Sequence, residues 1–203
     1  MQKRTIMVWL AMADDAQDHR DYFRIDDIVA IEYQLMPELI APGAAAFPFS
    51  DTSEQFQLIT EMQTIEAESQ QILRSIHEQD RQVANYLKNI DRRIQLLSRI
   101  IAACSEDIAS LPRQSVNLSE GGIAFSSSAP LPKGGYIAIK LVLFPSYAGM
   151  LLSGQIVSCE EANKTYTNHI TFECISDSDR QLLAKHVIQF QAQQRRARLD
   201  QSV

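Results

Sequence analysis

The chain contains few cysteines and none of the common catalytic motifs. Its three cysteines, Cys104, Cys159 and Cys174, are scattered along 203 residues without a CxxC pair. We therefore expect neither disulfide staples nor a zinc site, and this cysteine usage fits a reducing, cytoplasmic location. The sequence also lacks GxSxG, HExxH, a P-loop and a GxGxxG after a strand. These absences predict a protein that is not an enzyme and that holds no metal or cofactor.

Long apolar runs and an excess of positive charge are missing as well. The apolar run at residues 6–12 is too short to cross a bilayer, and Asp14 and Asp15 follow where a signal-peptidase site would lie. We expect no export signal and no membrane span, and Met12 is an alternative start to Met1. The formal net charge of −6 argues against bulk attraction to DNA, RNA or anionic membranes. An anionic ligand would need a local basic cluster.

Proline and glycine are both absent from residues 51–111. Asp51 or Ser53 is a suitable N-cap for a helix there, and Pro112 closes the segment. Apolar residues recur in this segment with alternating steps of four and three, which is the spacing of a heptad seam. The downstream series is Val83, Leu87, Ile90, Ile94, Leu97, Ile101, Cys104 and Ile108, and the upstream series is Leu58, Met62, Ile65, Ser69, Ile72 and Ile76. The two series do not join cleanly across the polar residues 77–81.

The residues on either side of this segment have the texture of strands. They are rich in β-branched and aromatic types, and proline, glycine or polar stretches separate the runs. A helix follows at 177–197, and its apolar face includes His186. This order indicates an antiparallel barrel or sandwich. The expected strands are 24–36, 116–126, 136–144, 151–160 and 167–174.

Geometry constrains the helical segment if the strands before and after it share one sheet. A single helix over 51–111 would be about 90 Å long. The linker at 37–50 would span only about 50 Å when fully stretched. We therefore expect a helical hairpin that turns near residues 77–81, with arms of about 40 and 45 Å. A domain-swapped dimer is the alternative.

Two short motifs carry candidate ligand-binding residues. Arg20 and Arg24 form an RxxxR segment ahead of the first strand. Residues four apart in an extended backbone project to the same side, so both guanidiniums would reach one ligand. The second motif runs from Asn117 to Gly122, where Asn117 and Ser119 offer short polar side chains and the glycines allow close backbone approach.

Together these motifs resemble the PilZ domain family, whose pattern is RxxxR followed, after the first strand, by [D/N]xSxxG. The resemblance implies a PilZ-like antiparallel β-barrel with a C-terminal helix that binds cyclic di-GMP, a bacterial second messenger. Arg20 and Arg24 would grip guanine edges and phosphates. Asn117 and Ser119 would hydrogen-bond a guanine, and Gly122 would keep the strand flat beneath it. The insertion resembles a tetrameric subgroup with long heptad helices, so the resemblance favours a homotetramer.

These expectations divide the chain into six segments. They are an N-terminal tail (1–18), the first part of the barrel (19–36), a linker (37–50), the helical hairpin (51–110), the second part of the barrel (111–176), and a C-terminal helix with its tail (177–203).

Plainer interpretations stay open for each feature. Arg20 and Arg24 could form a solvated charge pair near Asp18, Asp21 and Asp26. The Asn117–Gly122 motif could be an ordinary turn, and the heptad seam could be packing between two helices of one chain. The alternative function is an oligomeric PilZ-like scaffold or adaptor that binds no nucleotide. The sequence does not identify a downstream protein partner.

Overall fold

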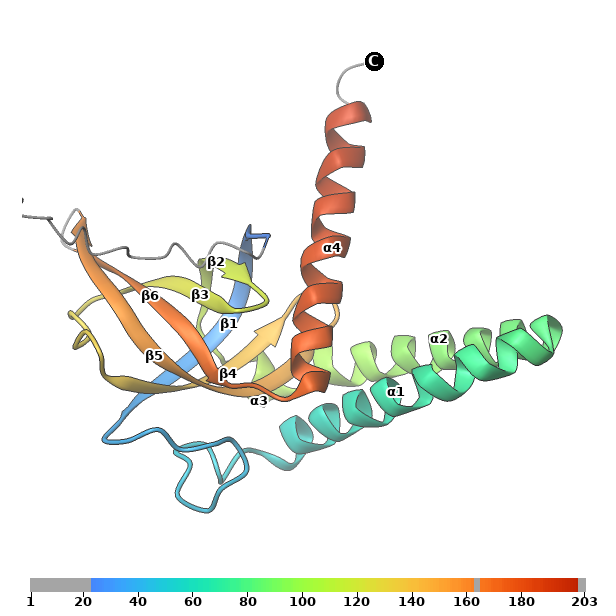
Figure 1. Ribbon diagram of the computed structural model, residues 1–203, viewed down its shortest axis with the longest axis horizontal. Helices are drawn as coiled ribbons and strands as arrows, with labels where there is room; N and C mark the ends of the chain where they lie inside the picture. Colours follow the sequence, from blue (N-terminus) through green and yellow to red (C-terminus); the bar gives the residue numbers. More distant parts are fainter. Residues whose placement is uncertain (1–22, 163–164, 201–203) are drawn as a thin grey trace, which may run out of the picture.

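The computed structural model describes residues 23–162 and 165–200 of the chain. Six antiparallel strands close into a barrel, from which a helical hairpin and a C-terminal helix project (Figure 1). Among the described residues, no helix has the length and apolar character needed to cross a membrane. The strands are β1 (Ile25–Met36), β2 (Arg113–Ser119), β3 (Gly122–Ser127), β4 (Tyr136–Leu143), β5 (Ala148–Ala162) and β6 (Thr165–Cys174), and the helices are α1 (Glu54–Gln79), α2 (Arg81–Ala103), α3 (Glu106–Ala109) and α4 (Asp177–Asp200).

The long first strand closes the barrel. β1 has 12 residues and pairs with two neighbours along its length. Its first half pairs with β2, from Ile25 opposite Leu118 to Ala30 opposite Arg113. Its second half pairs with β4, ending with Met36 opposite Tyr136. The strand order is therefore β1-β2-β3-β6-β5-β4, which confirms the expected antiparallel barrel. Because a single chain completes the ring, the fold does not require a domain swap.

Apolar side chains from every strand fill the barrel, and α4 covers one of its ends. Leu183 and Val187 of α4 are buried in the same cluster as the strand residues. Burying each such side chain stabilises the fold by about 1.5–3 kcal/mol. The strand residues with no more than 2% exposure in this cluster are Val29, Ile31, Leu118, Ile123, Phe125, Ile137, Ile139, Leu141, Leu143, Ala148, Met150, Leu152, Ile156 and Ile170.

One strand prediction was wrong. Residues 116–126 were expected as a single strand, but they form a hairpin of β2 and β3 that turns at Glu120 and Gly121. Ser119 lies opposite Gly122, and Val116 lies opposite Phe125. A two-residue loop of this kind reverses the chain without interrupting the strand-like composition on either side. Glu120, Gly121 and Gly122 mark this turn in the sequence, but the expected strand ran through them.

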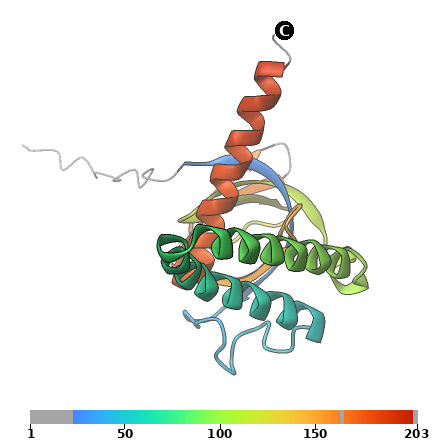
Figure 2. The same ribbon diagram turned by 90° about the vertical axis from the view of Figure 1, so that its right-hand side faces the viewer.

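The helical hairpin is confirmed, and it turns at Asp80. This residue ends α1 and also caps α2, because its carboxylate accepts hydrogen bonds from the backbone N–H groups of Gln82 (2.8 Å) and Val83 (3.1 Å). At the start of α1, the cap is the hydroxyl of Ser53, which accepts from the N–H of Phe56. α1 and α2 lie side by side in both views (Figures 1 and 2), and Figure 1 shows them leading away from the barrel.

Phe56 at the base of α1 anchors the hairpin to the barrel. Its side chain is 2% exposed, and its ring lies so close to Gly149 of β5 that a Cβ there would come within 2.8 Å of it. The side-chain amide of Gln63, two turns further along α1, pairs with the backbone O and N of Gly149 at 2.9 and 3.0 Å. The missing side chain of Gly149 therefore lets α1 lie directly against the barrel wall.

Replacing this aromatic anchor should destabilise the protein. We expect Phe56→Ala to lower the free energy of unfolding by about 3 kcal/mol, because it removes a buried ring and leaves a cavity. Urea unfolding followed by circular dichroism measures this change. Gln55→Ala, on the neighbouring exposed residue, is the matched control and should leave the unfolding midpoint unchanged. An equal unfolding midpoint for Phe56→Ala and wild type would contradict the proposal that Phe56 anchors α1 to the barrel.

Candidate functional site

The pairing of β1 with β2 brings the two sequence motifs together. It places Asp26 opposite Asn117, just after Arg24. The Nη1 of Arg24 donates to the Oδ1 of Asn117 at 3.0 Å, although the two residues are 93 positions apart in the chain. The Nδ2 of Asn117 in turn donates to the Oδ1 of Asp26 at 2.8 Å. Arg24 is exposed and Asn117 is half-buried, so a guanidinium, an amide and a carboxylate meet at the barrel surface.

Arg20, the first arginine of the RxxxR segment, lies outside the residues that the structure describes. The geometry of the site therefore comes from Arg24 and the β2–β3 hairpin. The structure does not pair Arg24 directly with Asp26, as the interpretation of a solvated charge pair supposed. The contact runs through the amide of Asn117 instead.

Ser119 and Gly122 support the turn that carries Asn117. Ser119 is 2% exposed, and its hydroxyl donates to the backbone oxygen of Gly122 at 3.2 Å. A Cβ on Gly122 would lie 2.3 Å from the backbone oxygen of Ile170 on β6. Glycine is therefore required here because β3 and β6 approach each other closely. The motif alone did not predict this contact between backbones, and a ligand contact by either residue stays a prediction.

A side chain at position 122 should destabilise the barrel itself. We expect Gly122→Ala to lower the free energy of unfolding by about 2 kcal/mol, because β3 and β6 must separate to admit the methyl group. Thermal unfolding measures the loss. Ser126→Ala, on an exposed residue of the same strand, is the control. If Gly122→Ala unfolded at the wild-type temperature, the close approach of the two backbones would not be limiting.

A buried hydrogen bond ties the strand of the site to α4. The Nε2 of His186 lies 2.7 Å from the Oδ2 of Asp27, and both side chains are 9% exposed. Asp27 follows Asp26 directly, and it points to the opposite side of β1. The helical periodicity predicted His186 on the apolar face of α4 but did not reveal this partner. The available signal was the position of Asp27 in phase with the inward-facing Ile25 and Val29, because a carboxylate there needs a polar partner.

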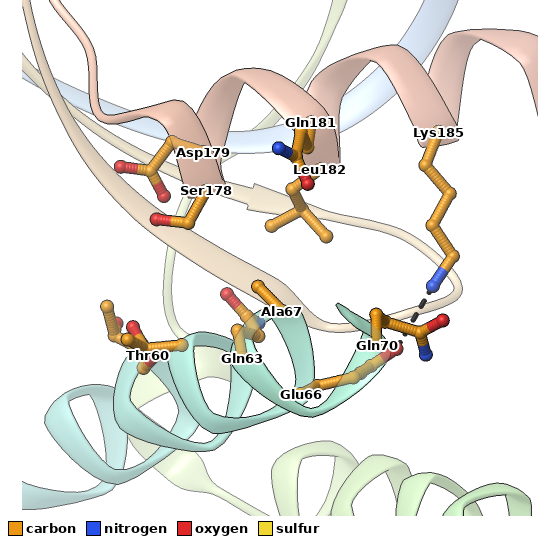
Figure 3. Close-up of a pocket in the computed structure, with 11 residues that line it drawn as sticks. Thr60, Gln63, Glu66, Ala67, Gln70, Ser178, Asp179, Gln181, Leu182 and Lys185 are labelled. Carbon is orange, nitrogen blue, oxygen red and sulfur yellow. Dashed lines mark hydrogen bonds and ion pairs between the residues drawn. The ribbon is translucent and has the colours of Figure 1, made fainter. Parts of the chain in front are cut away.

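A polar cleft lies between α1 and the first turns of α4 (Figure 3). The Oε1 of Glu66 on α1 accepts hydrogen bonds from Lys185 of α4 at 3.0 Å and from Gln95 of α2 at 2.8 Å. Burial raises the pKa of Asp179 at the other end of the cleft, and a hydrogen bond from Ser176 partly offsets this rise. Glu66 therefore joins the two arms of the hairpin to the helix that covers the barrel.

The chemistry of the surface site is that of recognition. A guanidinium offers a planar set of donors that matches a phosphate or the O6/N7 edge of guanine, and the amide of Asn117 adds a donor and an acceptor beside it. Within the part of the chain that the structure describes, no group of three or more His, Cys, Asp or Glu side chains is arranged to hold a metal ion.

The fold and the site together define a small β-barrel domain that is covered by a C-terminal helix and has a candidate ligand site on its outer wall. Residues 91–189 match the family model of the PilZ domain. This part of the chain is therefore similar to the PilZ domain, and the closed six-stranded barrel has a PilZ-like fold. The match begins within α2 and ends within α4, so it covers Asn117, Ser119 and Gly122 but not Arg24.

Two solved structures are similar to this chain, and the first of them shares its fold. A protein from Xanthomonas campestris, described as a tetrameric PilZ domain self-assembled via a helical bundle, is 12% identical with a TM-score of 0.51, over 86% of this chain and 91% of that chain. YcgR from Escherichia coli, solved in complex with c-di-GMP, is 19% identical with a TM-score of 0.37, over 47% of this chain and 42% of its own. A comparison with curated proteins found no match.

Proposed function

We propose that this protein is a non-enzymatic receptor for cyclic di-GMP, which it binds at its RxxxR and NxSxxG motifs, and that it oligomerises through α1 and α2. The observation that carries the proposal is the 3.0 Å hydrogen bond between Arg24 and Asn117. It joins two motifs that are far apart in the chain and typical of one family. In this proposal Arg20 and Arg24 bind guanine edges and phosphates, whereas Asn117, Ser119 and Gly122 form the adjoining wall.

The hydrogen bonds around Asn117 suit an exchange of partners on binding. Asp26 accepts from Nδ2 and so fixes the orientation of the amide, with Oδ1 toward Arg24. When Arg24 turns to the ligand, Oδ1 becomes available to accept an N–H of guanine. Arg20 and Arg24 supply positive charge beside Asp26, on a chain whose formal net charge is −6. Binding of the doubly anionic ligand should therefore weaken as salt is added.

The exposed seam on the hairpin supports the second half of the proposal. Leu97 and Ile101 of α2 are 60% and 65% exposed in the single chain. An apolar stripe of this length normally finds a partner in a soluble protein. The relative from Xanthomonas campestris, whose length is matched almost completely, assembles through helices. We therefore favour a tetramer held by the hairpins.

A calorimetric titration with cyclic di-GMP tests the ligand site. We expect Arg20→Ala, Arg24→Ala and Asn117→Ala each to weaken binding by about 10- to 100-fold, because each removes hydrogen bonds to a charged or buried group of the ligand. Lys133→Ala, which removes an exposed positive charge from the β3–β4 loop, should bind like wild type. Unchanged affinity in both arginine variants would refute the site.

Light scattering tests the oligomer. We expect the wild type to have the mass of a tetramer, and Leu97→Asp to reduce that mass, because a carboxylate would be buried in the interface. Gln71→Asp places the same charge on an exposed position of α1 away from the apolar stripe and is the control. A wild-type monomer would refute the assembly. A stable oligomer that shows no heat with cyclic di-GMP would instead favour the alternative function, a scaffold without a ligand.

A further inference from the structure

The two arms of the hairpin carry opposite charge. α1 contains five glutamates and one arginine, whereas α2 contains five basic residues and one aspartate. Among the described residues, no ion pair joins an acidic group of α1 to a basic group of α2 within the chain. The opposite charges of the two arms are therefore not matched inside one molecule.

The positions of Glu68 and Arg93 explain why these charges do not pair within one molecule. Both side chains are exposed, and each lies on the side of its helix that faces away from the other arm. The side that faces the other arm is marked on α1 by Glu66 and Leu73, and on α2 by Ala84 and Gln95. Glu68 therefore lies on the outer side of α1, and Arg93 lies on the outer side of α2.

Apolar residues flank both of these charges. Ile65 and Ile72 lie three residues before and four residues after Glu68, and they are 55% and 63% exposed. Tyr86 and Ile100 lie one heptad to either side of Arg93, and they are 65% and 60% exposed. Each outer side therefore presents a charge between apolar side chains, which is the pattern of a helix interface with a charged edge.

The register of the hairpin places the two charges at the same height. Glu66 contacts Gln95 across the hairpin at 2.8 Å. Two residues further toward the tip, α1 has Glu68 and α2 has Arg93. A second copy placed alongside the first, by rotation about an axis parallel to the hairpin, would therefore bring Glu68 of one copy level with Arg93 of the next.

From this complementarity we propose that α1 of one copy packs against α2 of a second copy, with Glu68 facing Arg93, so that the hairpins alternate α1, α2, α1, α2 around a closed ring. The contact is heterologous and closes by rotation, as in other cyclic assemblies. This arrangement rests on the proposed oligomerisation and adds to it which helices meet. The heptad seam of α2 then faces the axis of the ring.

Charge reversal tests the pairing. We expect Glu68→Lys and Arg93→Glu each to weaken association by about tenfold, because like charges then face each other between copies. The double variant Glu68→Lys/Arg93→Glu should recover the wild-type oligomer, because it restores opposite charges. If α1 instead packed on α1, and α2 on α2, the single reversals would only exchange one like-charged pair for another. Single variants with wild-type association would therefore overturn the proposal.

Matched controls separate the pairing from general charge effects. Arg92→Glu makes the same charge change one residue away, on a face turned by about 100°. Glu78→Lys does so on α1 near the tip. Both residues are exposed, and both variants should associate like wild type. Loss of association in these controls equal to that in Glu68→Lys and Arg93→Glu would also overturn the proposal.

Disulfide cross-linking gives an independent readout. In a background with Cys104, Cys159 and Cys174 changed to Ser, we would mix chains carrying Glu68→Cys with chains carrying Arg93→Cys. We expect mixed disulfides between the two kinds of chain, and little homodimer of either. Homodimers alone would refute the pairing of α1 with α2 while leaving the oligomer intact. A wild-type monomer in light scattering would refute the oligomer and this pairing together.

Discussion

The antiparallel pairing of β1 with β2 is the constraint on which the rest of the molecule depends. The two strands are neighbours in the barrel, but residues 37–112 of the chain lie between them. Their register sets Arg24 against Asn117, so the candidate site exists only if this long connection returns to its starting point. A hairpin satisfies that condition because its two arms lead out and back. The same pairing lets β1 reach β4 and close the barrel.

Local sequence patterns were sufficient to predict much of this fold. The absence of proline and glycine marked the helical insertion, and the broken heptad register located its turn, where Asp80 caps α2. The convergence of Arg24 with Asn117 followed from two motifs, each beside a strand. What the sequence could not reveal were partners fixed only by packing. Gly122 is required by a backbone oxygen of Ile170, and Asp27 meets His186 from the far end of the chain.

Two pairs of adjacent residues connect the site, the covering helix and the hairpin. On β1, Asp26 points outward to Asn117 while Asp27 points inward to His186. On α4, His186 contacts β1 while Lys185 contacts Glu66 of α1. α4 is thus held by a polar contact on each side, one to the barrel and one to the insertion. Together with the apolar contacts of Leu183 and Val187, these bonds fix its position over the end of the barrel.

The hairpin also allows its own length to change independently of the geometry of the ligand-facing wall. Because both arms begin and end beside the same edge of the barrel, a heptad added to each arm would extend the tip by about 10 Å without altering the pairing of any strand. Deleting one heptad from each would shorten it equally. The length of the hairpin can therefore change during evolution while the ligand-facing wall keeps its geometry, provided that both arms gain or lose the same number of residues.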